Sequence, residues 1–131
     1  MKLVEIFKAR EPLKRLTEKR FNSYKALRQL VKLQKAVESE VEFYIGEERK
    51  AIARFAAMDE KGNPIFLSDG RLQLKDAEAK VAFENEIGKL NDTEVEDIEK
   101  VTLCESDFIS PGDYPTPSDM VLLESVITFE D

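Results

Sequence analysis

The chain has 131 residues, 42% of them hydrophobic and 36% charged, which is enough apolar material for the core of one domain. It contains no histidine and only one cysteine, Cys104, which excludes catalysis through histidine, an ordinary zinc site and an intrachain disulfide. The net charge of −7 is unevenly divided: residues 1–35 carry eleven basic and three acidic side chains, whereas residues 90–131 carry one basic and twelve acidic side chains.

The first half of the chain predicts helix, because residues 13–58 are rich in Leu, Ala, Glu, Lys and Arg and contain no proline. Asn22 and Ser23 are residue types that cap helices. The pattern therefore predicts a shorter helix over 11–20 and a long one over 23–58, with one continuous helix as the alternative. Residues 3–7 fit either a short edge strand or a leading helical turn.

The long predicted helix is amphipathic, with Val41 and Tyr44 on its apolar face. The basic side chains nearly opposite this face are Lys25, Arg28, Lys32 and Lys35. The apolar positions also fit a heptad, although Gln34 and Glu48 interrupt it. The pattern favours packing against a sheet or helix of the same chain, and a dimerising helix pair is the alternative. Val41, Tyr44 and the four basic residues are candidate interaction residues.

A β-hairpin is predicted over residues 65–74. The preceding segment 59–64 contains Gly62 and Pro64 and ends the long helix. Asp69-Gly70 then separates two short apolar stretches, and this pair favours a type I′ turn, which needs positive φ at both central residues.

A second helix is predicted over about 76–90, with Asp76 as its N-cap. The residues expected to contact the core from this helix are Val81, Phe83, Ile87 and Leu90. Asn91-Asp92 ends it.

The last forty residues predict a small sheet. Residues 94–105 fit one or two strands, in which the inward residues are Val95, Ile98, Val101 and Leu103. Three prolines and a glycine make 107–117 a loop, and a short C-terminal helix from Ser118 to Ser125 precedes a strand over 126–129. We expect one α+β domain over 1–131 with a small antiparallel sheet.

The order of these features resembles an uncharacterised family of small phage and prophage proteins. The residues that carry the resemblance are Leu30-Val31-Lys32-Leu33, the helix end and turn from Arg54 to Asn63, and Leu90-Asn91-Asp92-Thr93-Glu94-Val95. The resemblance covers most of residues 23–103 and implies a phage context. It carries over no activity and no functional residue.

Two charged regions are candidates for function. The acidic candidates Glu94, Glu96, Asp97 and Glu99 offer oxygen ligands for a divalent cation, but they lack the spacing of a calcium-binding loop, so a solvated face is favoured. The basic helix face could neutralise phosphates. The isoelectric point near 4.8 argues against nucleic-acid binding. An acidic surface that imitates DNA and occupies a basic protein is a further alternative.

The sequence therefore favours a non-enzymatic protein-interaction module without a cofactor, such as a phage-encoded adaptor, assembly factor or inhibitor. Its expected partner is another protein or a second copy of itself. The alternative is an enzyme that uses carboxylates and a divalent cation. We expect no membrane span and a location in the cytoplasm, because no long apolar run is present and cysteine is scarce.

Overall fold

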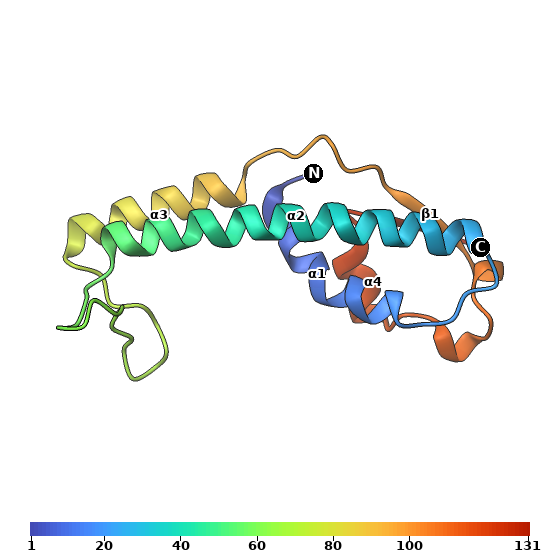
Figure 1. Cartoon of the computed structure of the whole chain (residues 1–131), viewed down its shortest axis with the longest axis horizontal. Coiled ribbons are helices and arrows are strands. Elements are labelled where there is room, and N and C mark those ends of the chain that lie inside the picture. The colour runs from blue at the N-terminus through green and yellow to red at the C-terminus, as the bar shows by residue number, and fades with distance from the viewer.

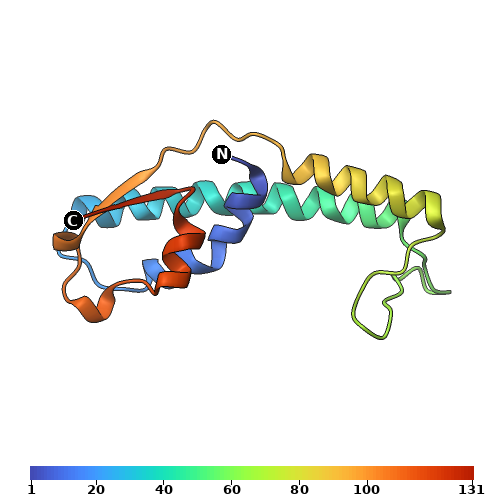
Figure 2. The same cartoon turned by 180° about the vertical axis from the view of Figure 1, so that it is seen from behind.

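The computed structural model describes all 131 residues as an elongated molecule (Figures 1 and 2). We call residues 46–89, which form a pair of helices and the tip between them at one end, the arm. The remaining residues, 1–45 and 90–131, form the head. The elements in chain order are α1 (Leu3–Thr17), α2 (Tyr24–Phe55), α3 (Ala77–Asn91), β1 (Val101–Cys104), α4 (Pro117–Leu123) and β2 (Ile127–Glu130). Two short 3₁₀ turns, Glu105–Asp107 and Pro111–Asp113, lie between β1 and α4. Helix α2 runs through both parts of the molecule and joins them (Figure 1).

The core lies in the head and consists of 19 buried hydrophobic side chains. Helix α1 contributes Leu3, Ile6, Ala9, Leu13 and Leu16, which recur at helical spacing. Leu30 of α2, Leu103 of β1 and Leu123 of α4 meet this row, and each is at most 1% exposed. The α+β class predicted from the sequence is thus confirmed, with the first and last elements of the chain sharing one core.

The start of helix α1 differs from the prediction. The sequence placed a helix over 11–20 with Pro12 in its first turn, whereas α1 begins at Leu3 and holds Pro12 inside it. An internal proline costs about 3 kcal/mol, and burial of the five apolar residues of α1 offsets that cost. Of the two alternatives for the long segment, separate helices are correct, because the Ser23 hydroxyl caps α2 by accepting a hydrogen bond from the Ala26 N–H at 3.1 Å.

The predicted antiparallel sheet is wrong in direction: β1 and β2 are parallel, with Val101 opposite Ile127 and Cys104 opposite Glu130. The reason lies in the connection. The two 3₁₀ turns and α4 carry the chain back before β2 begins, and a crossover of this kind produces parallel strands. The predicted inward residues Val95, Ile98, Val101 and Leu103 are all buried. Only the last two of these residues lie in a strand.

Helix α3 matches its predicted span, and the Asp76 side chain caps it by accepting from the Ala79 N–H at 2.7 Å. Of its predicted core contacts, Leu90 is half-buried and packs against the core, whereas the prediction is wrong for Val81, Phe83 and Ile87. None of its residues is buried, and Val81 is 57% exposed. Helix α3 packs mainly on the second half of α2 and also contacts α1, and its outer face has no neighbour (Figure 1).

The tip of the arm, residues 56–75, contains the predicted hairpin in reduced form. Phe66 and Leu72 form one antiparallel bridge around the Asp69-Gly70 turn. Gly70 has a positive φ of 86°, but Asp69 does not, so the predicted type I′ turn is wrong. The pairing does not extend into strands because a third segment, which follows α2, competes for it. Ala56 bridges Leu74, and Met58 bridges Pro64.

Three residues spaced eight apart close the tip. The Ala57 N–H donates to the Gln73 carbonyl at 2.9 Å, the Gln73 N–H to the Ile65 carbonyl at 2.9 Å, and the Ile65 N–H to the Ala57 carbonyl at 3.0 Å. We call this closed set the hydrogen-bond ring. It ties the end of α2 to the approach to α3 without a hydrophobic core.

An ion pair joins α1 to α4 and predicts a pH dependence of stability. Arg15 contacts Asp119 through two hydrogen bonds, at 2.7 and 3.0 Å. The hydrogen bond from Arg15 lowers the pKa of Asp119 from its usual 3.8. Because the folded pKa is below the unfolded one, this stabilisation is present above about pH 4 and is lost as the pH falls through the lowered folded value.

Asp119→Asn is therefore expected to lower the free energy of unfolding at pH 7, by less than about 1 kcal/mol because the pair is partly exposed. Urea unfolding of both proteins from pH 7 to pH 2 measures the effect. The difference between them should shrink below pH 4, and a difference that stays constant to pH 2 would contradict this account.

Candidate interaction site

The acidic candidates lie on an extended segment, residues 92–100, that runs alongside α2 from the end of α3 to β1 (Figures 1 and 2). We call this segment the strap. Val95 and Ile98 anchor it in the core at 8% exposure each. The backbone fixes its start, because the Leu3 N–H donates to the Thr93 carbonyl at 2.9 Å. The exposed residues of the strap include all four acidic candidates, Glu94, Glu96, Asp97 and Glu99.

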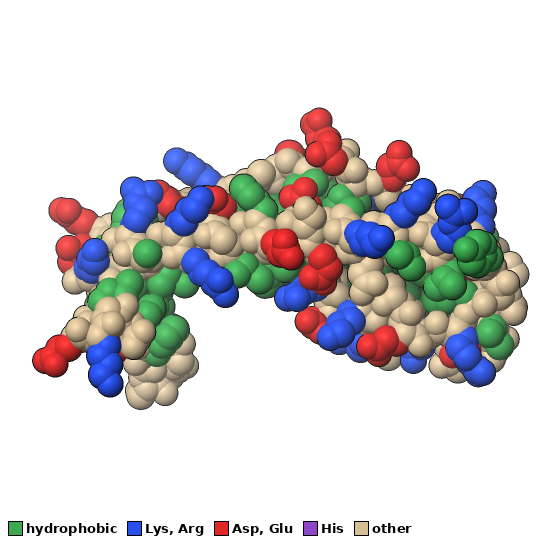
Figure 3. All heavy atoms as spheres, viewed as in Figure 1, with side chains coloured by type: hydrophobic (Ala, Val, Ile, Leu, Met, Phe, Trp, Pro, Cys, Tyr) green, Lys and Arg blue, Asp and Glu red, His purple; other side chains and the backbone are tan.

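The basic candidates lie on the first half of α2. Lys25, Arg28, Lys32 and Lys35 are all exposed, and none of them forms an ion pair. The space-filling view shows their end of the molecule as basic and the strap along its upper edge as acidic (Figure 3). The two charged regions thus adjoin one another within the head, and both remain open to solvent.

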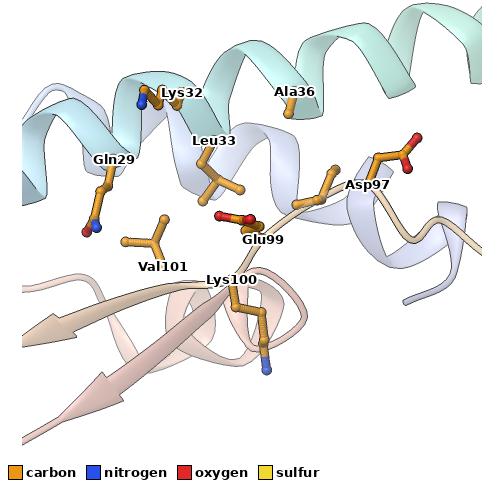
Figure 4. Close-up of a pocket in the computed structure, with 9 residues that line it drawn as sticks. Gln29, Lys32, Leu33, Ala36, Asp97, Glu99, Lys100 and Val101 are labelled. Atoms are coloured by element: carbon orange, nitrogen blue, oxygen red, sulfur yellow. The ribbon is translucent and has the colours of Figure 1, made fainter.

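One pocket brings the two sets together. It lies between α2 and the strap, and its lining includes Lys32 from the basic face and Asp97 and Glu99 from the acidic set. Leu33 and Glu99 point toward one another across it, whereas Lys100 points away from α2 (Figure 4). The pocket holds charges of both signs and forms no ion pair, so it has no clear preference for an anion or a cation.

Val41 and Tyr44 are buried in the core of the chain itself, at 1% and 6% exposure. The Tyr44 ring lies 4.5 Å from that of Phe7, and its hydroxyl donates to Asn91 Oδ1 at 2.7 Å. Burial, followed by the nearby Glu48 carboxylate, raises the pKa of Tyr44. These two residues stabilise the join between arm and head and are not available to a partner, so they are removed from the candidate interaction residues.

The carboxylates needed for the metal-dependent alternative do not converge. No group of three Asp, Glu or Cys side chains is placed to hold a metal ion. Several of them have structural partners instead. Asp92 accepts from Lys2 Nζ at 3.3 Å, Asp107 from the Cys104 N–H at 2.7 Å, and Asp113 from the Ser110 hydroxyl at 3.2 Å. These carboxylates hold turns and the start of the strap.

The arm is a surface that the sequence did not point to. None of its residues, 46–89, belongs to the core or packs against it. It exposes Val81 on α3, and Phe66 and Leu67 at the tip, at 57%, 61% and 42%. The arm carries nine acidic and eight basic side chains, in contrast to the divided charge of the head. The arm thus combines a nearly balanced charge with exposed apolar side chains.

Packing within the arm is limited to one helix pair. Ala51 is the buried residue at the centre of the contact, at 3% exposure, and Arg54 Nη1 pairs with Glu86 Oε1 at 2.7 Å. The sequence predicted the two helices and the hairpin between them. It did not show that none of the residues of α3 is buried.

Comparison with family models, curated proteins and solved structures finds no match to the chain in any of the three. No helix combines the length and apolar character required to cross a membrane.

Proposed function

We propose that the chain is a non-enzymatic protein-interaction module, an adaptor or assembly factor of phage or prophage origin that acts in the cytoplasm of the host cell. In this proposal the head is the folded anchor and the arm is the part that a partner protein contacts. The resemblance of residues 23–103 to small phage and prophage proteins supports the phage context.

The observation that carries the proposal is the absence of core contacts along the arm. Forty-four consecutive residues, 46–89, project from the head as two helices and a closed tip, and α3 buries none of its residues. A helix that stays in the chain for its own stability normally buries an apolar stripe. A helix pair that buries so little, yet keeps Val81 and Phe66 exposed, is better suited to contact another protein.

The chemistry of the surface supports binding over catalysis. The carboxylates are dispersed or engaged in turns, and the pocket beside the strap mixes two lysines with two carboxylates. A catalytic site requires groups that converge on one reacting atom. The charged surface instead offers many separate contacts, and charges of this kind steer association between proteins.

Site-specific crosslinking in a lysate of the cells that express the chain tests the proposal. A photoreactive amino acid replaces Val81 on the arm in one protein and Ile109 on the head in a matched control, since both side chains are exposed. We expect a discrete protein adduct from position 81 and none from position 109. Adducts only from position 109, or none from either position, would contradict an interaction through the arm.

A further inference from the structure

A cavity at the end of the head opposite the arm is lined by both aromatic and acidic side chains. It lies beside the end of β2, near the C-terminus in Figure 1, and its volume is about 320 Å³. Three aromatic residues line it, Phe108, Tyr114 and Phe129. Three acidic residues also line it, Glu105, Glu130 and Asp131, whereas no lysine or arginine does.

The aromatic side chains are held in fixed positions. The ring centroids of Phe108 and Tyr114 lie 5.1 Å apart with their planes at 79°, so that the two rings form a corner. Phe21 supports Phe108 from behind at 5.2 Å. The Tyr114 hydroxyl donates to Glu105 Oε1 at 3.0 Å, which fixes the tyrosine ring and places a carboxylate at the rim.

We propose that this cavity binds a methylated ammonium group, as found in choline or in the side chain of trimethyl-lysine. Aromatic rings attract cations through the negative potential of their faces, and an adjacent carboxylate adds a full opposite charge. The lining supplies three carboxylates and no cationic side chain, and these carboxylates attract a cation. This inference concerns the head and does not depend on the role of the arm.

The walls select this cation over a small metal ion. A hard cation such as Mg²⁺ binds through several oxygen ligands that converge on it. Glu105, Glu130 and Asp131 line the cavity but do not form a group placed to hold a metal ion. A methylated ammonium group spreads its charge over an apolar surface, so its methyl groups can contact the half-buried rings of Tyr114 and Phe129 while its charge faces Glu105 and Glu130. Phe108 is buried and supports the Tyr114 ring.

Methyl NMR of the full chain provides the test, because the protein has three methionines and only Met120 lines the cavity. Met58, in the tip, and Met1 are internal controls. Choline chloride is titrated into protein with labelled methionine methyl groups, at constant ionic strength. We expect a saturable shift of the Met120 signal alone. Neohexyl alcohol, the uncharged isostere of choline, should produce none.

Two variants test separately how an aromatic ring and a carboxylate contribute to choline binding. Phe129→Leu keeps apolar volume and removes a ring, and Glu130→Gln removes a charge from an exposed strand position. Each should weaken choline binding about tenfold or more. The matched control Glu124→Gln, an exposed acid outside the lining, should bind as the parent does. If Phe129→Leu unfolds, Glu130→Gln alone decides.

Two short peptides show whether the bound methylammonium group belongs to a small molecule or to a modified protein. The peptides have the same sequence, but one contains trimethyl-lysine where the other contains unmodified lysine. Tighter binding of the methylated peptide than of choline assigns the cavity to a modified protein, and tighter binding of choline assigns it to a small molecule. Equal shifts with choline and neohexyl alcohol, no shift of Met120, or unchanged binding by Glu130→Gln would overturn the proposal.

Discussion

Leu30→Ala is expected to lower the free energy of unfolding by about 2–5 kcal/mol, the range for removing a large apolar side chain from a packed core. Leu30 is completely buried and meets side chains of the head from the first half of α2. Truncation removes its transfer free energy and leaves a void that the surrounding helices fill only in part. Urea unfolding followed by far-ultraviolet circular dichroism measures the loss.

The matched control is Leu27→Ala, one turn earlier on the same helix. Leu27 is 38% exposed, and alanine has the higher helix propensity, so the change is expected to cost less than about 1 kcal/mol. Equal losses for the two variants would show that the helix, and not its buried face, determines stability. That result would contradict the placement of the core in the head.

Gln73→Pro is expected to open the tip without unfolding the head. The Gln73 N–H donates to the Ile65 carbonyl in the hydrogen-bond ring, and proline has no N–H to donate. Loss of this bond removes about 0.5–1.5 kcal/mol, the net contribution of a typical intramolecular hydrogen bond. Hydrogen exchange at Ala57 and Ile65, the other two donors of the ring, should accelerate by up to about tenfold.

Gln73→Ala is the control, because it keeps the N–H and changes only an exposed side chain. Exchange at Ala57 and Ile65 should then stay as in the parent protein. Amides of the core, such as that of Leu33, should be protected equally in all three proteins. Faster exchange at Leu33 in Gln73→Pro would show that the tip and the head unfold together, and would contradict the separation between them.

The local elements of the fold were predictable because their signals are local. Ser23 and Asp76 cap the helices that the sequence assigned to them, and Val95 and Ile98 are buried as their pattern predicts. The direction of the sheet was not predictable, because it depends on the path of the chain between Cys104 and Ile127. The predicted start of α1 was wrong, because proline favours the first turn of a helix and Pro12 was therefore placed there. The apolar residues before Pro12, such as Leu3 and Ile6, have helical spacing and are buried in the core.

The candidate surfaces were predictable in composition and not in arrangement. Charge counts located the basic face and the acidic strap, yet the approach of Lys32 to Asp97 and Glu99 follows from the path of the strap alongside α2. The aromatic cavity could not be predicted either, because it also depends on the path of the chain. Tyr114 lies in a proline-rich loop and Phe129 in the last strand, and only the parallel pairing of β1 and β2 brings them to one site.

The division between arm and head also sets an order of folding. Pairing in the arm is local in sequence, as in the hydrogen bond from Lys75 to Phe55, whereas the head joins Leu3 to Ile127. Contacts between distant segments form slowly, because a long loop must close first. During synthesis the ribosome releases the whole arm before the last strand exists. The contacts within the arm can therefore form before those contacts of the head that require β2.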